Sequence, residues 1–218
     1  SSLVVWLFIA AGFAAQPTLV RDGQPVARIY TTGPVGELPD RAGDDAVARH
    51  AAHSELVYHI EKMSGATLDV VVTDDPATIE GPAIVLGELA RRLGAQPDPS
   101  GYEEGFRLLT DDDRLLIAGE TDEATLYGVY ELLRMLGCDW VMPGEIGEII
   151  PRRTTVALPM VDQSYAPDFP YRRLWYRGGS RFNTPDDYAR FSQWSRRHKM
   201  GIGKGVPPLA GGHVWDTF

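Results

Sequence analysis

Imidazole and carboxylate side chains gather on one predicted helix, where such groups could bind a metal ion. His50 and His53 are three residues apart, and Glu55 and His59 are four apart, so each pair shares a helix face. A zinc site of the metalloprotease type needs two histidines four apart with a glutamate between them, and this spacing does not match that pattern. We therefore predict no metal site here and expect these side chains to lie on a solvated helix face.

Motifs for nucleotide binding and for nucleophilic catalysis are missing. The sequence has no Gly-Lys-Ser/Thr triplet and no Gly-x-Ser-x-Gly elbow, and prolines rather than a helix follow the basic glycine-rich run 201–205. The single cysteine, Cys138, excludes an internal disulfide and lies in an apolar strand context where a thiol is inert. We predict neither a catalytic nucleophile nor a cofactor.

The most suggestive chemistry lies in residues 171–218. Aromatic rings stack on sugars, guanidinium groups bind carboxylates and hydroxyls, and both kinds of side chain occur together in residues 171–179. From residue types alone, Arg177 and His213 are candidate substrate-binding residues. The alternative, that these side chains pack against other parts of the protein, stays open.

Charge is divided unevenly along the chain of 218 residues. The net charge of −9 combines −15 in residues 1–170 with +6 in residues 171–218. A protein this acidic is not a general nucleic-acid binder, because phosphate neutralisation requires clustered positive charge. The charge shift and three nearby prolines predict a linker over residues 159–170, and we expect the acidic partners of the basic segment to lie outside this chain.

The first fifteen residues form an uncharged apolar run that ends in alanines. The run is shorter than the roughly 20 residues of a membrane span and is typical of a signal peptide's hydrophobic region. We predict an exported protein, whether periplasmic, cell-surface or secreted, without a stable membrane span after cleavage. A buried strand or helix is the alternative. At the other end the sequence stops without a closing helix or strand, which suggests an N-terminal fragment.

Two strong helices and several short strands are predicted in residues 17–158. Apolar residues recur at helical spacing in 44–63 and 122–136, and Thr121 or Asp122 can cap the second helix. A shorter helix is predicted at 88–93. Strands are predicted at 18–23, 26–31, 68–73, 83–87, 106–110, 114–118 and 138–142. The pattern indicates an α+β domain with a mixed β-sheet and two main helices.

Four runs of sequence occur in an order that is typical of a known domain: 55–66, 104–107, 124–133 and 137–144. Together they resemble the N-terminal domain of alpha-glucuronidase-like proteins of glycoside hydrolase family 67. The same domain type precedes the barrel in beta-hexosaminidases, and it opens a large group of exported bacterial proteins. The resemblance covers about residues 17–218.

This resemblance implies a beta-hexosaminidase-like accessory domain over residues 17–158, followed after the linker by the incomplete start of a TIM-type barrel over 171–218. The first barrel strand would lie at about 171–177 and the first barrel helix at about 186–199. A full barrel needs about 250 residues, which again implies a fragment.

The resemblance also limits what can be assigned to the site. Glycoside hydrolysis uses two carboxyl groups, and in the families resembled these come from later barrel strands, so no catalytic residue is assigned. Trp175 takes the place of a tryptophan that borders the sugar site in the alpha-glucuronidases. The residues that follow, Tyr176, Arg177 and Gly178, differ from the family's Asp-Asn type segment.

The implied function is that of an exported glycoside hydrolase-like protein acting on polysaccharide or oligosaccharide. This chain would supply the accessory domain and one wall of the saccharide site, with Trp175, Arg177 and His213 as substrate-binding residues. The alternative is a non-catalytic carbohydrate-binding or surface-interaction protein with the same fold. Neither interpretation requires a metal, a cofactor or a nucleic acid, and the sequence does not indicate an oligomeric state.

Overall fold

The computed structural model describes residues 16–38, 43–174 and 184–207. Its centre is a six-stranded mixed sheet with the strand order β11-β6-β7-β5-β3-β4. The strands are β3 (Arg28–Thr31), β4 (Asp69–Val72), β5 (Ala83–Leu86), β6 (Phe106–Asp111), β7 (Arg114–Gly119) and β11 (Asp162–Tyr165). Four adjacent strands, β4, β3, β5 and β7, pair in parallel, and β11 runs in the same direction, whereas β6 is antiparallel to both of its neighbours. The predicted mixed sheet is confirmed.

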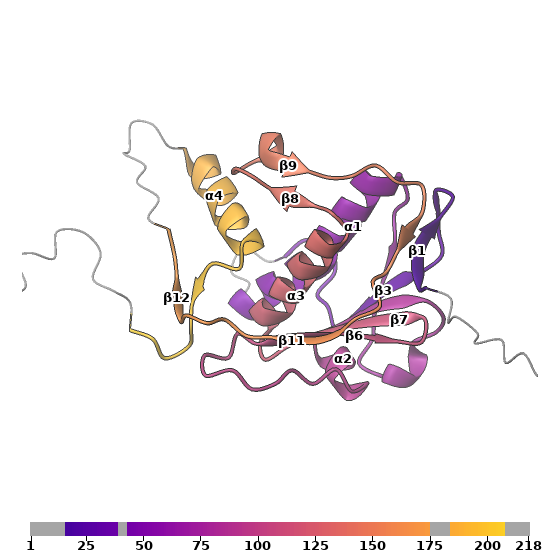
Figure 1. Ribbon diagram of the computed structural model, residues 1–218, viewed down its shortest axis with the longest axis horizontal. Helices are drawn as coiled ribbons and strands as arrows, with labels where there is room; N and C mark the ends of the chain where they lie inside the picture. Colours follow the sequence, from indigo (N-terminus) through magenta and orange to yellow (C-terminus); the bar gives the residue numbers. More distant parts are fainter. Residues whose placement is uncertain (1–15, 39–42, 175–183, 208–218) are drawn as a thin grey trace, which may run out of the picture.

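Two long helices cover one face of this sheet and a short helix covers the other (Figure 1). The long helices are α1 (Asp44–Ser64) and α3 (Asp122–Met135), which pack against each other, and the short helix is α2 (Glu88–Arg92). Both predicted main helices and the short helix are confirmed.

Side chains of the parallel strands alternate between two apolar cores. Ile84 and Ile117 belong to the core beneath α1 and α3, whereas Val85 and Leu116 pack with Leu89 of α2. Because β5 and β7 are buried on both faces, they appear in the sequence as continuous apolar runs instead of alternating ones.

Local sequence signals set the helix ends. The Thr121 side chain accepts a hydrogen bond from the Ala124 amide at 3.1 Å, which caps α3 as predicted. Gly65 ends α1 in the left-handed conformation at φ 78°, and its amide donates to the Glu61 carbonyl oxygen. Thr184 and Asp187 form a capping box at the start of α4 (Pro185–Arg197), the helix predicted over 186–199.

Shorter antiparallel pairs lie beside the main sheet. They are β1 (Thr18–Arg21) with β2 (Gln24–Pro25) and β10 (Val156–Ala157), β8 (Asp139–Trp140) with β9 (Glu148–Ile149), and β12 (Tyr171–Arg172) with β13 (Gly201–Ile202). Single 3₁₀ turns, η1 and η2, occupy Pro76–Thr78 and Glu145–Gly147. No helix in the described parts of the chain is both long enough and apolar enough to cross a membrane.

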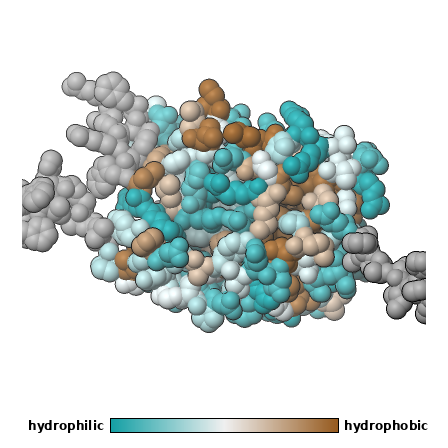
Figure 2. Space-filling view, in the orientation of Figure 1, coloured by the Kyte–Doolittle hydropathy of each residue, from teal (hydrophilic) through white to brown (hydrophobic). Residues whose placement is uncertain are grey.

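The structure differs from the predicted strands in three places. The hairpin partner of β1 is β2, whereas Arg28–Thr31 enters the main sheet between β4 and β5. The strand predicted at 138–142 ends at Trp140, and Val141 and Met142 are exposed in an apolar surface over the β8–β9 hairpin (Figure 2). Within the stretch predicted as a linker, Asp162–Tyr165 form β11, which pairs with β6.

The segment predicted to begin a barrel contains the expected strand and helix with a different pairing. Strand β12 pairs antiparallel with β13, which follows α4. Successive strands of a TIM barrel are parallel, so the described residues do not form a barrel unit of that kind.

Candidate functional site

A pocket of about 690 Å³ lies where residues 171–204 dock against the N-terminal part of the chain. Its walls come from the loop 102–104, the first half of α3, the segment around β12 and β13, and the face of α4 that runs from Tyr188 to Arg196. The pocket therefore exists only because α4 and β12 return to the domain that precedes them.

Three ion pairs join the two sides of this pocket. They are Arg172 with Glu104 at 2.9 Å, Arg196 with Glu123 at 3.1 Å and Lys204 with Glu103 at 2.6 Å. In each pair the basic residue belongs to the positively charged C-terminal segment and the acid to the negatively charged domain. The expectation that the acidic partners of this segment lie outside the chain is therefore wrong for these residues.

Aromatic rings form the apolar part of the lining. Tyr102, Tyr127, Tyr188 and Phe191 all border the pocket. The Tyr127 hydroxyl donates to the Met200 carbonyl oxygen at 3.4 Å, which ties α3 to the segment before β13. Rings beside charged hydrogen-bonding groups suit a ligand with apolar faces and polar edges, such as a sugar.

Glu123 is the carboxyl group in the pocket whose proton affinity is altered. Burial raises its pKa, the partner Arg196 opposes that change, and the nearby acids Asp44 and Glu104 add to it. A carboxyl group with a raised pKa can carry a proton closer to neutral pH.

A buried polar cluster lies on another face of α4. The Arg197 guanidinium donates to both carboxylate oxygens of Glu55 on α1, with the shortest distance at 3.0 Å, and to Glu148 on β9 at 2.6 Å. Arg197 is 4% exposed, and the Tyr58 hydroxyl donates to the second oxygen of Glu148 at 2.7 Å. Every charge in this cluster is therefore paired and hydrogen-bonded.

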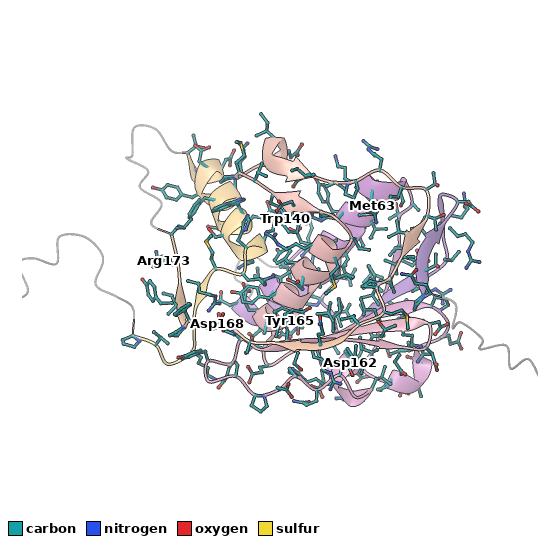
Figure 3. The ribbon with its side chains drawn as sticks, in the orientation of Figure 1. Met63, Trp140, Asp162, Tyr165, Asp168 and Arg173 are labelled. Carbon is teal, nitrogen blue, oxygen red and sulfur yellow. The ribbon has the colours of Figure 1, made fainter. Side chains whose placement is uncertain are left out.

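Trp140 lies between α4 and the helices α1 and α3 (Figure 3). Its indole N–H donates to His59 Nε2 at 3.1 Å, and its carbonyl oxygen accepts from Trp194 at 2.8 Å and from His198 at 2.7 Å. His59 Nδ1 donates to the Glu55 carbonyl oxygen at 2.8 Å. Both ring nitrogens of His59 are occupied, and burial lowers its pKa, so the ring is neutral.

The prediction that the histidines of α1 lie on a solvated face is wrong. His53, Glu55 and His59 are buried, because the loop at Pro34 covers the first, α4 covers the second and Trp140 packs on the third. Among residues 16–38, 43–174 and 184–207, no group of three or more His, Cys, Asp or Glu side chains could hold a metal ion.

The three predicted substrate-binding residues, Trp175, Arg177 and His213, lie outside the described residues. The described residues directly before Trp175, from Arg172 to Leu174, line the pocket, and Figure 3 shows Arg173 beside β12. Sequence reasoning missed Glu104, Glu123 and Tyr127. The opposite charge of the two chain segments was the signal that could have indicated such pairs.

No protein-family model matches this chain, and no curated protein matches it. Its fold is similar to that of a family GH115 4-O-methyl-alpha-glucuronidase with specificity for decorated arabinogalactans. The TM-score is 0.59 and the sequence identity is 19%. The similarity covers 84% of this chain and 25% of that chain, so the chain spans about a quarter of the glucuronidase's length. The domain thus has a fold that is found in a glycoside hydrolase.

Proposed function

We propose that this chain is the N-terminal part of an exported glycoside hydrolase-like protein that acts on polysaccharide or oligosaccharide. In this proposal residues 17–158, whose main sheet β11 extends, form an accessory domain of the glucuronidase or hexosaminidase type, and residues 171–218 lead into a barrel domain. The leader in residues 1–15 directs export. Trp175, Arg177 and His213 contact the saccharide from the barrel side.

The pocket at α4 is the observation that carries this proposal. It combines aromatic rings with hydrogen-bonding charged groups, and it lies on a fold that is shared with an alpha-glucuronidase. Small-molecule sites characteristically combine apolar walls with a few placed polar groups. The pocket also directly precedes Trp175 in the chain, so the proposed contacts lie close to it in sequence.

Binding without catalysis is the second candidate function, and one observation favours it. Each of the three glutamates that line the pocket, Glu103, Glu104 and Glu123, is paired with a basic residue. Carboxylates held in ion pairs are suited to shaping a pocket, whereas glycoside hydrolysis needs an acid and a base or nucleophile placed across the scissile bond.

Calorimetric titration of the chain with oligosaccharides tests the proposal. The panel contains neutral arabinogalactan fragments and the same fragments bearing glucuronate. We expect binding by at least one fragment, and Tyr188→Ala to weaken it about tenfold, since loss of an aromatic contact of about 1.4 kcal/mol has that effect.

Ile146→Ala is the matched control, because Ile146 is 88% exposed and does not line the pocket. Absence of binding across the panel, or equal affinity in both variants, would overturn the proposed site. Hydrolysis of a bound fragment by a longer product of the same gene would support the enzyme, and binding without hydrolysis would support the alternative.

A further inference from the structure

Helix α4 is attached to the rest of the molecule in a different way from the other long helices. Helix α1 buries eight of its residues and α3 buries nine, whereas the buried residue of α4 is Arg197. Trp194 adds a partly buried apolar contact. Apolar burial, which holds α1 and α3 in place, therefore contributes little to the docking of α4.

Charged contacts take the place of apolar burial in residues 171–174 and 184–204. Five of its basic residues pair with acids of the preceding domain: Arg172 with Glu104, Arg196 with Glu123, Arg197 with Glu55 and Glu148, Lys199 with Glu131, and Lys204 with Glu103. The Arg197 cluster differs from the rest because its three side chains are all nearly buried. The others are more exposed and contribute little each.

The contact with α4 keeps the carboxylates of the Arg197 cluster away from water. Glu55 on α1 and Glu148 on β9 are in contact with α4, so departure of α4 would let water reach both carboxylates. The attraction within a buried ion pair roughly offsets the cost of removing its charges from water. The ion pairs of this cluster therefore add little net free energy to docking, and loss of one charge leaves its partner buried and unpaired.

We infer that Arg197, Glu55 and Glu148 form a latch that closes α4 onto α1 and β9, that protonation of Glu148 opens it, and that its closure assembles the pocket wall. The pocket wall depends on the latch because α4 carries Tyr188, Phe191 and Arg196 into the lining. The latch acts whether or not the pocket binds a saccharide.

The groups around the latch determine how it responds to pH. Those near it are Tyr58 and His59 on α1, Tyr130 and Arg134 on α3, Arg196 on α4, His198 directly after α4, Glu145 on η2, and Cys138 and Arg153 beside β8 and β9. Burial would raise the pKa of Glu148, but hydrogen bonds from Tyr58 and Arg197 outweigh burial and hold that pKa below its usual value. A carboxylate with a depressed pKa stabilises the closed form above its ordinary pKa, and this contribution is lost as the pH falls through the depressed value. Acid therefore opens the latch.

Hydrogen exchange of the whole chain, with protection factors followed separately for α4 and for β5 and β7, tests the inference. In the wild type we expect α4 protection to fall severalfold more than that of β5 and β7 between about pH 5 and pH 3, because the depressed pKa of Glu148 places its proton uptake in this range. Arg197→Gln should produce the same selective loss already at pH 7.5, because two carboxylates then face each other without a cation. Arg196→Gln is the matched control, since the Arg196 pair with Glu123 is more exposed.

A triple variant isolates the charge effect. Replacing Arg197, Glu55 and Glu148 together by glutamine removes the three charges, so acid should lower α4 protection no more than it lowers that of the sheet strands. The inference is overturned if α4 protection in the wild type is unaffected by acid, if α4 and the sheet lose protection by the same factor, or if α4 in the triple variant still loses more protection than the sheet. The pH dependence of α4 protection in the wild type tests the inference even if Arg197→Gln fails to fold.

Discussion

At the scale of single residues, burial decides which groups are reactive. Cys138 begins the segment that leads into β8, and its thiol is buried. Burial raises its pKa from 9.0 to about 12, with Arg153 and Arg197 partly opposing that effect. A thiol that does not ionise at neutral pH is a poor nucleophile, so Cys138 acts as a small core residue.

We therefore expect Cys138 to resist alkylation in the folded chain. At pH 8 the thiolate fraction of a group with a pKa of about 12 is about a thousandfold below that of an ordinary cysteine. Iodoacetamide should modify the native chain slower than the urea-unfolded chain by a comparable factor, as measured by mass spectrometry. Similar rates in the two states would show that the thiol is accessible and ionised.

At the scale of elements, close backbone approaches determine how α3 sits on the sheet. A Cβ atom at Gly119, the last residue of β7, would lie 2.2 Å from the Thr125 amide nitrogen of α3. At Gly128, in the middle of α3, a Cβ atom would lie 2.6 Å from the Ile117 side chain. Both glycines let α3 approach β6 and β7 more closely than any other residue would allow.

Replacement of Gly119 by alanine should destabilise the chain by about 3 kcal/mol, because the crowded neighbour is backbone and cannot rotate away. Urea unfolding followed by circular dichroism measures the loss. Gly101→Ala is the control, since nothing lies within 4 Å of the added atom and its backbone is not left-handed. We expect a change within about 0.5 kcal/mol there; equal losses in both variants would contradict the packing account.

At the scale of the whole molecule, buried histidines link folding to pH. His53 and His59 are both buried, and burial lowers their pKa from the ordinary value of 6.5. In the unfolded chain both rings take up protons as the pH falls below 6.5, whereas the folded chain resists this uptake. The unfolded state then binds more protons, so stability decreases as the pH falls.

We expect the free energy of unfolding to fall between pH 7.5 and pH 5.5, by as much as about 1 kcal/mol per pH unit below 6.5 for each histidine. Urea midpoints at several pH values measure this. His53→Gln should reduce the slope, because it removes one of the two buried rings. A flat profile in this range would contradict the neutral, buried state of the rings.

The distribution of charge also acts at this scale. The sequence shows an acidic region followed by a basic one, and a domain boundary is the ordinary interpretation of such a change. In the structure the basic residues of 171–204 dock on the acidic region through ion pairs. The acidic and the basic parts of the sequence therefore form two surfaces that attract each other within the described chain.

The sequence by itself determined the helices and most strands, because their signals are local. Helical periodicity and end signals such as Thr121 and Gly65 operate within a few residues, so α1 and α3 could be located without any tertiary contact. The turn at Asp112, with φ 52°, is another case, since an acidic residue there tolerates the left-handed conformation.

Only the tertiary structure decided which polar groups are buried and which residues form the pocket. Glu55 and Arg197 are 142 positions apart, and Trp140 and His59 are 81 apart. No periodicity spans such distances, so α1 appeared solvated along the very face that α4 covers. The physical reason is that a buried charge is acceptable only beside its partner, and chain packing alone brings those partners together.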